Sequence, residues 1–125
     1  MTFTGPSLNY LAAEVSDTFE AGTDHSVYMK LRNNVGTGEQ CKTDVLDSPG
    51  NSWSRGYWEE YTNEKGELDP CGGFYPVDGK LQFTLDGYIG VSLDKVELQF
   101  GRKKYFWSGN AEYWGGKDNW QSLRN

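Results

Sequence analysis

Oxygen-bearing residues lie close together in the early part of the chain, around a glycine. Glu20 precedes the run Gly22-Thr23-Asp24, and residues 27–31 then alternate between apolar and more polar types. Gly22 can adopt backbone conformations that other residues avoid, so carbonyl oxygens of the turn can point in one direction. Carboxylate and carbonyl oxygens are the ligands that calcium prefers. The stretch therefore predicts an oxygen-lined loop of the calcium-binding kind, directly before a β-strand.

The aspartates of such loops have a second, purely structural explanation. Asp24 and the later Asp47 both lie in turn-like stretches. Aspartate side chains in turns commonly accept hydrogen bonds from nearby backbone N–H groups. Both explanations stay open on the sequence alone, because each requires no more than an aspartate in a turn.

Other polar residues do not favour catalysis. His25 is the only histidine, with an aspartate before it and a serine after it. Adjacent residues of a strand point to opposite faces, so these three neighbours do not make a catalytic triad. A carboxylate pair for glycoside hydrolysis could come from Glu59, Glu60 or Glu67, but no spacing selects one pair. We therefore expect a binding protein and not an enzyme.

Length and composition indicate the fold class. The 125 residues suit a single domain spanning 1–125, which would bury roughly two-thirds of its unfolded surface. Eighteen acidic and 12 basic residues give a net charge of −6, which disfavours binding to nucleic acid. Sixteen glycines, 15% aromatic residues and no long helical pattern favour short strands and turns. We expect an all-β sandwich.

Seven stretches have the alternation or the composition of strands. They are residues 10–15, 27–31, 39–46, 53–61, 80–85, 93–100 and 105–107. The basic turn 101–104 predicts a hairpin between the last two strands. Turn-forming residues are concentrated in the connections at 33–38, 47–52 and 63–79.

The two cysteines give information about the compartment. Cys41 and Cys71 have no CxxC partner and no clustered histidines, so a structural zinc site is not expected. A disulfide between them is favoured, with two separate thiols as the alternative. Because disulfides form in oxidising compartments, we expect a secreted or extracellular protein whose signal peptide is absent from this sequence. No stretch approaches the roughly 18 consecutive apolar residues of a membrane span.

Several motifs follow one another along the chain. They are Glu20-Ala21-Gly22-Thr23-Asp24, Asp47-Ser48-Pro49-Gly50-Asn51, Trp53-Ser54-Arg55-Gly56, Leu85-Asp86-Gly87 and the strand 92–98. In this order they resemble the PLAT (LH2) domain family, with a similarity that covers about residues 9–107. The resemblance implies an eight-stranded antiparallel β-sandwich, PLAT/C2-like, that binds lipids, membranes or proteins.

Calcium ligands in loops at one end of the sandwich are also implied by the resemblance. Matched residue by residue, they are Glu20, Gly22, Thr23, Asp24, Asp47, Asn51 and Asp86. Gly22 and Thr23 would bind through backbone oxygens. Ser52 stands where calcium-binding members of the family can carry an aspartate, so one ion is expected in preference to two.

Aromatic residues are the second predicted source of binding. The chain has five tryptophans and eight tyrosines, more than a small core needs. Trp53 resembles the family's buried aromatic residue. Trp58, Trp114 and Trp120 are predicted to contact a ligand, at a bilayer interface, on a sugar ring or on a protein. For residues 113–120, a terminal strand packed back on the sandwich is the alternative.

The sequence thus predicts a non-catalytic module that binds a lipid or membrane surface with the help of calcium. A bound cation would cancel negative charge and bridge to lipid phosphate. A carbohydrate-binding sandwich with exposed aromatic residues and a protein-interaction domain are the alternatives.

Overall fold

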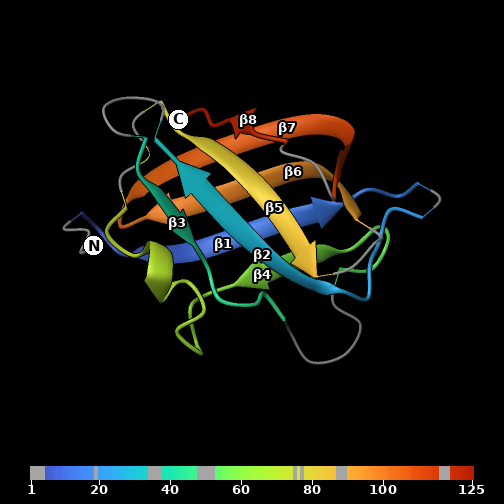
Figure 1. Cartoon of the computed structure of the whole chain (residues 1–125), viewed down its shortest axis with the longest axis horizontal. Helices are drawn as coiled ribbons and strands as arrows, with labels where there is room; N and C mark the ends of the chain where they lie inside the picture. Colours follow the sequence, from blue (N-terminus) through green and yellow to red (C-terminus); the bar gives the residue numbers. More distant parts are fainter. Residues whose placement is uncertain are drawn as a thin grey trace.

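Two four-stranded antiparallel sheets form the computed structural model (Figure 1). The structure describes residues 5–18, 20–33, 38–47, 53–74, 76, 78–86, 90–115 and 119–125. The strands are β1 (Leu8–Val15), β2 (Ser26–Arg32), β3 (Gln40–Lys42), β4 (Trp58–Tyr61), β5 (Lys80–Asp86), β6 (Val91–Phe100), β7 (Lys103–Trp114) and β8 (Gln121–Ser122). The first sheet has the order β4-β1-β6-β7 and the second sheet β3-β2-β5-β8. No described helix is long and apolar enough to cross a membrane.

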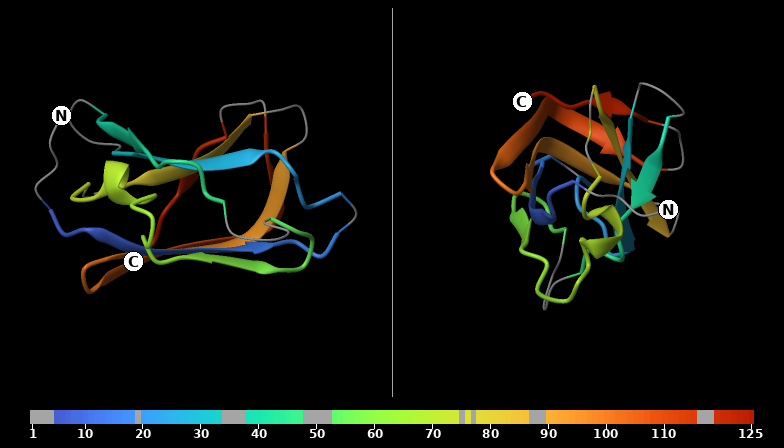
Figure 2. Two further views of the ribbon diagram at one scale, coloured as in Figure 1. Left: turned by 90° about the horizontal axis from the view of Figure 1, so that it is seen from below. Right: turned by 90° about the vertical axis from the view of Figure 1, so that its left-hand side faces the viewer.

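The two sheets face each other as the layers of a sandwich (Figure 2). Successive side chains of a strand point to opposite faces. In β2 the predicted alternation is present, because Val27, Met29 and Leu31 are fully buried while the residues between them are half-buried. In β6 the apolar residues Val96, Leu98 and Phe100 are buried in the same way. The predicted eight-stranded all-β sandwich is confirmed.

Aromatic rings form a continuous row through the core. Phe83 of β5 contacts both Trp53 and Trp114, with ring centroids 5.8 and 5.5 Å apart. Trp114 also contacts Trp107, at 5.5 Å. The row therefore joins the two sheets, and Trp53 is buried as the resemblance implied.

Two predicted strands are shorter than expected, and the last predicted strand is much longer. β3 is limited to Gln40–Lys42, and β4 begins at Trp58 and not at residue 53. Trp53 has a φ of 58° and Gly56 a φ of 80°, which places 53–57 in a turn because such backbone angles break a strand. β7 continues to Trp114, which pairs with Val91.

A disulfide joins Cys41 of β3 to Cys71, with Cα atoms 5.3 Å apart. Cys71 ends the short 3-10 helix η1 (Asp69–Cys71). The bridge therefore anchors the edge strand β3 to the long connection between β4 and β5, and the predicted pairing is confirmed.

Candidate functional site

Three segments meet at one end of the sandwich, on the right of Figure 1. They are residues 20–25, 53–57 and 90–92, here called the loop end. The Thr23 N–H donates to the Trp53 carbonyl at 3.0 Å, and the Ser92 N–H donates to the Ala21 carbonyl at 2.8 Å. The 20–25 segment is thus held from both sides by backbone hydrogen bonds.

Gly22 permits the close approach of two of these segments. A Cβ atom at this position would lie 2.7 Å from the Trp53 carbonyl oxygen and 2.9 Å from the Arg55 nitrogen. Both neighbours are backbone atoms that cannot move aside without changing the turn. The sequence indicated that the loop needs a glycine at this position. The structure shows why, because a side chain at residue 22 would collide with the backbone of residues 53–55.

A hollow of about 350 Å³ opens beside this contact, and it is lined by Gly22, Thr23, Asp24, His25, Trp53, Ser54 and Arg55. Asp24 is exposed at its edge. The Thr23 hydroxyl accepts a hydrogen bond from the His25 N–H at 3.1 Å, which shapes the turn. Three of the predicted calcium ligands, Gly22, Thr23 and Asp24, are therefore brought together here.

Other predicted calcium ligands do not line this hollow. Asp47 lines a different hollow, of about 360 Å³, together with Asp44, Glu60 and Glu67 among others. Glu20 is exposed and has a φ of 61°. The predicted ligand Asn51 lies outside the described residues.

Asp86 already has a hydrogen-bond partner. The Tyr28 hydroxyl donates to its carboxylate at 3.0 Å, and this bond raises the pKa of Tyr28. Within the described ranges, no group of three or more His, Cys, Asp or Glu side chains is placed to hold a metal ion. Calcium binding at the loop end stays a prediction.

Trp114 does not lie at the surface, so the prediction that it contacts a ligand is wrong. Its side chain is 0% exposed, between Phe83 and Trp107. The reason is the length of β7, which carries Trp114 into the core. Its neighbour Tyr113 points outward and is 49% exposed, and its hydroxyl accepts a hydrogen bond from the Gly90 N–H at 2.9 Å. Alternation along a longer strand would have identified Tyr113 from the sequence.

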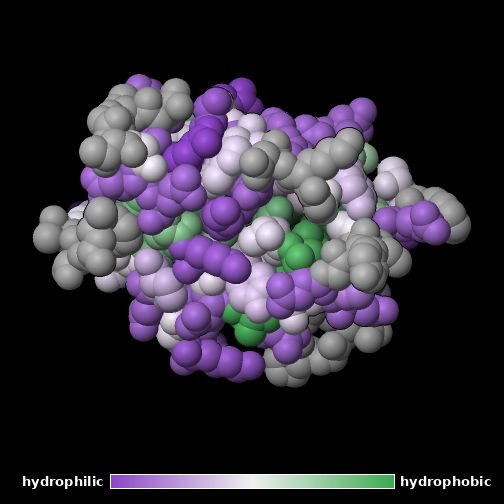
Figure 3. Space-filling model, viewed as in Figure 1, coloured by the Kyte–Doolittle hydropathy of each residue, from purple (hydrophilic) through white to green (hydrophobic). Residues whose placement is uncertain are grey.

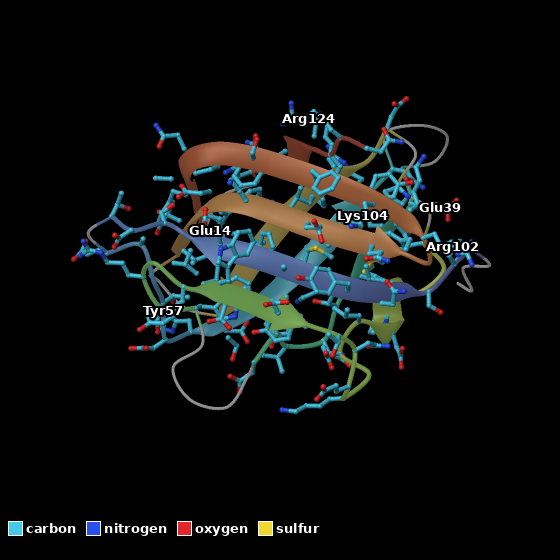
Figure 4. All side chains as sticks on the ribbon, turned by 180° about the vertical axis from the view of Figure 1, so that it is seen from behind. Glu14, Glu39, Tyr57, Arg102, Lys104 and Arg124 are labelled. Atoms are coloured by element: carbon cyan, nitrogen blue, oxygen red, sulfur yellow. A yellow bond between two sulfur atoms is a disulfide. The ribbon has the colours of Figure 1, made fainter. Side chains whose placement is uncertain are left out.

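Exposed aromatic residues gather at the loop end. Tyr57 is 65% exposed and Trp58 is 49% exposed. The Val15 N–H donates to the Tyr57 carbonyl at 2.9 Å, which fixes this pair beside the end of β1. Tyr57 lies at the same end as Glu14 and far from Lys104 (Figure 4). Trp58 is accessible to a ligand, and its predicted contact with one stays a prediction.

Trp58 also borders a hollow of about 330 Å³ on the outer face of the first sheet, with Tyr10, Ala12, Glu60 and Glu97. Ala12 is buried beneath these larger side chains. The Tyr10 hydroxyl donates to Glu60 at 2.8 Å. Burial, together with this carboxylate, raises the pKa of Tyr10 to about 12. The hollow thus combines aromatic and carboxylate groups.

Trp120 lies on the opposite side of the molecule. Its ring centroid is 4.5 Å from the Arg32 guanidinium carbon and 5.4 Å from the Lys30 Nζ. The following residues form β8, which pairs with β5. The end of the chain therefore does pack back on the sandwich, while Trp120 stays half-buried.

No protein-family model matches the chain, and no curated protein sequence matches it. Solved structures do share its fold. Alpha toxin from Clostridium absonum is 19% identical, with a TM-score of 0.63, over 99% of this chain and 33% of the toxin chain. Coral 8R-lipoxygenase, described as activated by calcium via a C2-like domain, is 20% identical, with a TM-score of 0.57, over 91% of this chain and 16% of that chain. The chain therefore has a PLAT/C2-like β-sandwich fold and spans a third or less of these two proteins.

Proposed function

We propose that this chain is a non-catalytic module, a single domain over 1–125, that binds the surface of a lipid membrane through its loop end. The observation that carries the proposal is the exposure of Tyr57, Trp58 and Tyr113 at that end. Tyrosine and tryptophan have an apolar body and a polar tip, which suits the boundary between lipid and water. The disulfide supports a secreted or extracellular location.

Calcium is the cation that we propose for the loop end. The support is the Gly22-Thr23-Asp24 hollow and the likeness to a C2-like domain through which calcium activates a lipoxygenase. The described side chains do not complete a ligand set by themselves. Membrane binding and calcium binding are therefore tested separately.

Membrane binding is tested by co-sedimentation with phosphatidylcholine vesicles, with and without added phosphatidylserine. Replacing Tyr57 and Trp58 by alanine should weaken binding at least about tenfold. Full burial of one aromatic side chain contributes roughly 1.5–3 kcal/mol, and about half of each of these two side chains is exposed and free to enter lipid. Phe106→Ala is the matched control, since Phe106 is 40% exposed on β7 away from the loop end. Absence of binding to every vesicle, in calcium and in chelator, would overturn the proposed function.

Calcium binding is tested by thermal unfolding of the chelator-treated protein, with magnesium as the control. Calcium at a hundred times its dissociation constant would stabilise the native state by roughly 2.7 kcal/mol. Asp24→Asn should abolish this stabilisation without changing the stability of the metal-free protein. A calcium-induced shift that survives in Asp24→Asn would reject the Asp24 loop as the site.

A second candidate function, carbohydrate binding, is favoured by the hollow beside Trp58. A flat indole ring suits the apolar face of a sugar, and the Glu60 and Glu97 carboxylates can accept hydrogen bonds from its hydroxyls. Binding on a glycan array that is lost in both Trp58→Ala and Glu97→Gln would support it. The Glu97→Gln protein should keep full vesicle binding, which separates the two candidates.

A further inference from the structure

Four basic residues share the outer face of the second sheet. They are Lys30 and Arg32 of β2, Lys42 of β3 and Lys80 of β5, here called the basic face. Alternation places them outward, because Met29, Leu31, Cys41 and Leu81 between or beside them are buried in the core. Figure 1 is viewed onto this sheet, and Figure 3 shows mostly hydrophilic side chains on the same side.

Strand register brings these cations together in pairs. Lys30 lies directly opposite Lys42, and Arg32 lies directly opposite Lys80. Like charges in directly opposite positions destabilise a sheet. The chain carries a net charge of −6, so this concentration of positive charge does not follow from its overall composition.

No carboxylate of the described residues forms an ion pair with the basic face, although Asp44 and Asp86 both act on Tyr28, the ring against which Lys42 lies. Within the described part of the chain, the one ion pair joins Arg55 to Asp17 and involves none of the four cations. On the outer face of β5 the carboxylate is Asp86, at the far end of the strand, where the Tyr28 hydroxyl donates to it. The positive charges of the basic face are therefore available to an external anion.

Aromatic rings hold the cationic side chains in place. Lys30 and Arg32 both lie against Trp120, and the Lys42 Nζ is 4.4 Å from the centroid of Tyr28. A cation over a ring keeps its charge, and its N–H donors directed away from the ring stay free to bind an anion. Less side-chain freedom is then lost when an anion binds.

We infer that the basic face binds the phosphate groups of anionic lipids at a bilayer surface; this inference rests on the proposed function and specifies the lipid class. The basic face and the loop end share a strand, because β2 begins at Ser26 directly after residues 20–25 and carries Lys30 and Arg32 further along. A bilayer can contact both when the sandwich is tilted. A long nucleic acid would extend beyond the four cations and meet the surrounding negative charge, whereas lipid phosphates are presented one by one in a plane.

The test compares two double variants in vesicle co-sedimentation. Lys30→Gln with Arg32→Gln removes two charges from the basic face. Lys95→Gln with Lys104→Gln removes two charges from β6 and β7 of the first sheet and is the matched control. A basic residue close to an anionic bilayer contributes about a fivefold gain in affinity, so the first variant should bind phosphatidylserine vesicles roughly 25-fold more weakly. The control should change by less than about twofold.

Four results would overturn the inference, and they are distinguishable. Equal losses in the two variants would show that net charge alone matters. Binding that does not depend on phosphatidylserine would remove the lipid class while leaving the proposed function intact. Stronger binding to RNA or to a sulfated glycan than to vesicles would assign the face to another polyanion. Absence of binding to every vesicle would instead reject the proposed function, and the inference with it.

A third variant separates binding from folding. Lys80→Gln removes one charge of an opposed pair, so it should raise the unfolding temperature slightly while weakening vesicle binding about fivefold. A gain of stability together with a loss of binding cannot arise from damage to the fold. Loss of binding accompanied by a lower unfolding temperature would contradict the role of Lys80.

Discussion

The outer faces of the two sheets carry charge in opposite arrangements. On the first sheet Glu14 lies directly opposite Lys95, so opposite charges are paired across β1 and β6. On the second sheet Lys30 lies opposite Lys42 and Arg32 opposite Lys80. Figure 4 is viewed from the side of the first sheet and labels Glu14 and Lys104 on it. The first face has one cross-strand pair of opposite charges, whereas the second face has two opposed like-charge pairs and gains a positive surface at a cost in stability.

Each face also carries one accessible tryptophan, with different neighbours. Trp58 borders a hollow with Tyr10, Glu60 and Glu97. Trp120 lies against Lys30 and Arg32. The same side chain is therefore placed beside carboxylates on one face and beside cations on the other. An aromatic residue alone does not select a ligand class, and the charges around it make the difference.

The largest expected effect comes from removing the disulfide, which attaches β3 of the second sheet to η1. Replacing Cys41 and Cys71 by alanine should lower the free energy of unfolding by about 2–4 kcal/mol. β3 would lose its anchor to η1, and Lys42 would lose its fixed position. Hydrogen exchange should then accelerate in β3 more than in β4, the edge strand of the first sheet. Equal acceleration in both edge strands would show that the bridge does not act locally.

Charge reversal should change stability in opposite directions on the two faces. Lys80→Glu places a carboxylate opposite Arg32 and should stabilise the protein by about 0.2–1 kcal/mol. Lys95→Glu places a carboxylate opposite Glu14 and should destabilise it by a similar amount. The measurement is the midpoint of urea unfolding, with an unchanged slope as the sign of an intact fold. Shifts of the same sign would contradict the contrast between the faces.

The architecture could be predicted from the sequence because it depends on local patterns. Alternation in residues 27–31 and 93–100 fixed which side chains enter the core, and both stretches are strands. The length of β7 could not be obtained in this way. Its register with β6 shifts between Leu93 and Lys95, and the chain passes through Ala111 at a φ of 52°. The Asp94 carboxylate accepts hydrogen bonds from the Ala111 N–H and from the Ser16 hydroxyl. Residues far apart in the sequence therefore stabilise the register shift, beyond which β7 continues and places Trp114 in the core.

Candidate sites were predictable to the extent that they are continuous in sequence. Gly22, Thr23 and Asp24 line one hollow as expected from adjacent residues. Asp47 lines a different hollow, and Asp86 lies opposite Ser26 and accepts a hydrogen bond from Tyr28, because their positions depend on how separate segments pack. The basic face escaped prediction for the same reason. Its four cations come from three strands, and only the register places them opposite one another.

The smallest expected effect concerns the tyrosine on each outer face that donates to a carboxylate. Tyr10 donates to Glu60 and Tyr28 donates to Asp86. The pKa of Tyr10 is raised to about 12, whereas an unfolded tyrosine ionises near 10. Between these values the unfolded state releases a proton that the folded state keeps, so stability falls as pH rises from about 10 to 12.

Tyr10→Phe should remove part of this alkaline loss. The measurement is the free energy of urea unfolding below pH 10 and again between pH 10 and 12, for the wild type and the variant. Lysines also titrate in this window. The informative quantity is therefore the difference in unfolding free energy between the wild type and the variant at each pH, and not the pH dependence of either protein alone. Tyr28→Phe should act in the same direction but less, since the raised pKa of Tyr28 is due mainly to its hydrogen bond with Asp86 and that of Tyr10 mainly to burial. A Tyr10→Phe protein that loses stability with rising pH as steeply as the wild type would show that the hollow beside Trp58 does not shield the Tyr10 phenol from water. That result would also weaken the case for this hollow as a sugar-binding site.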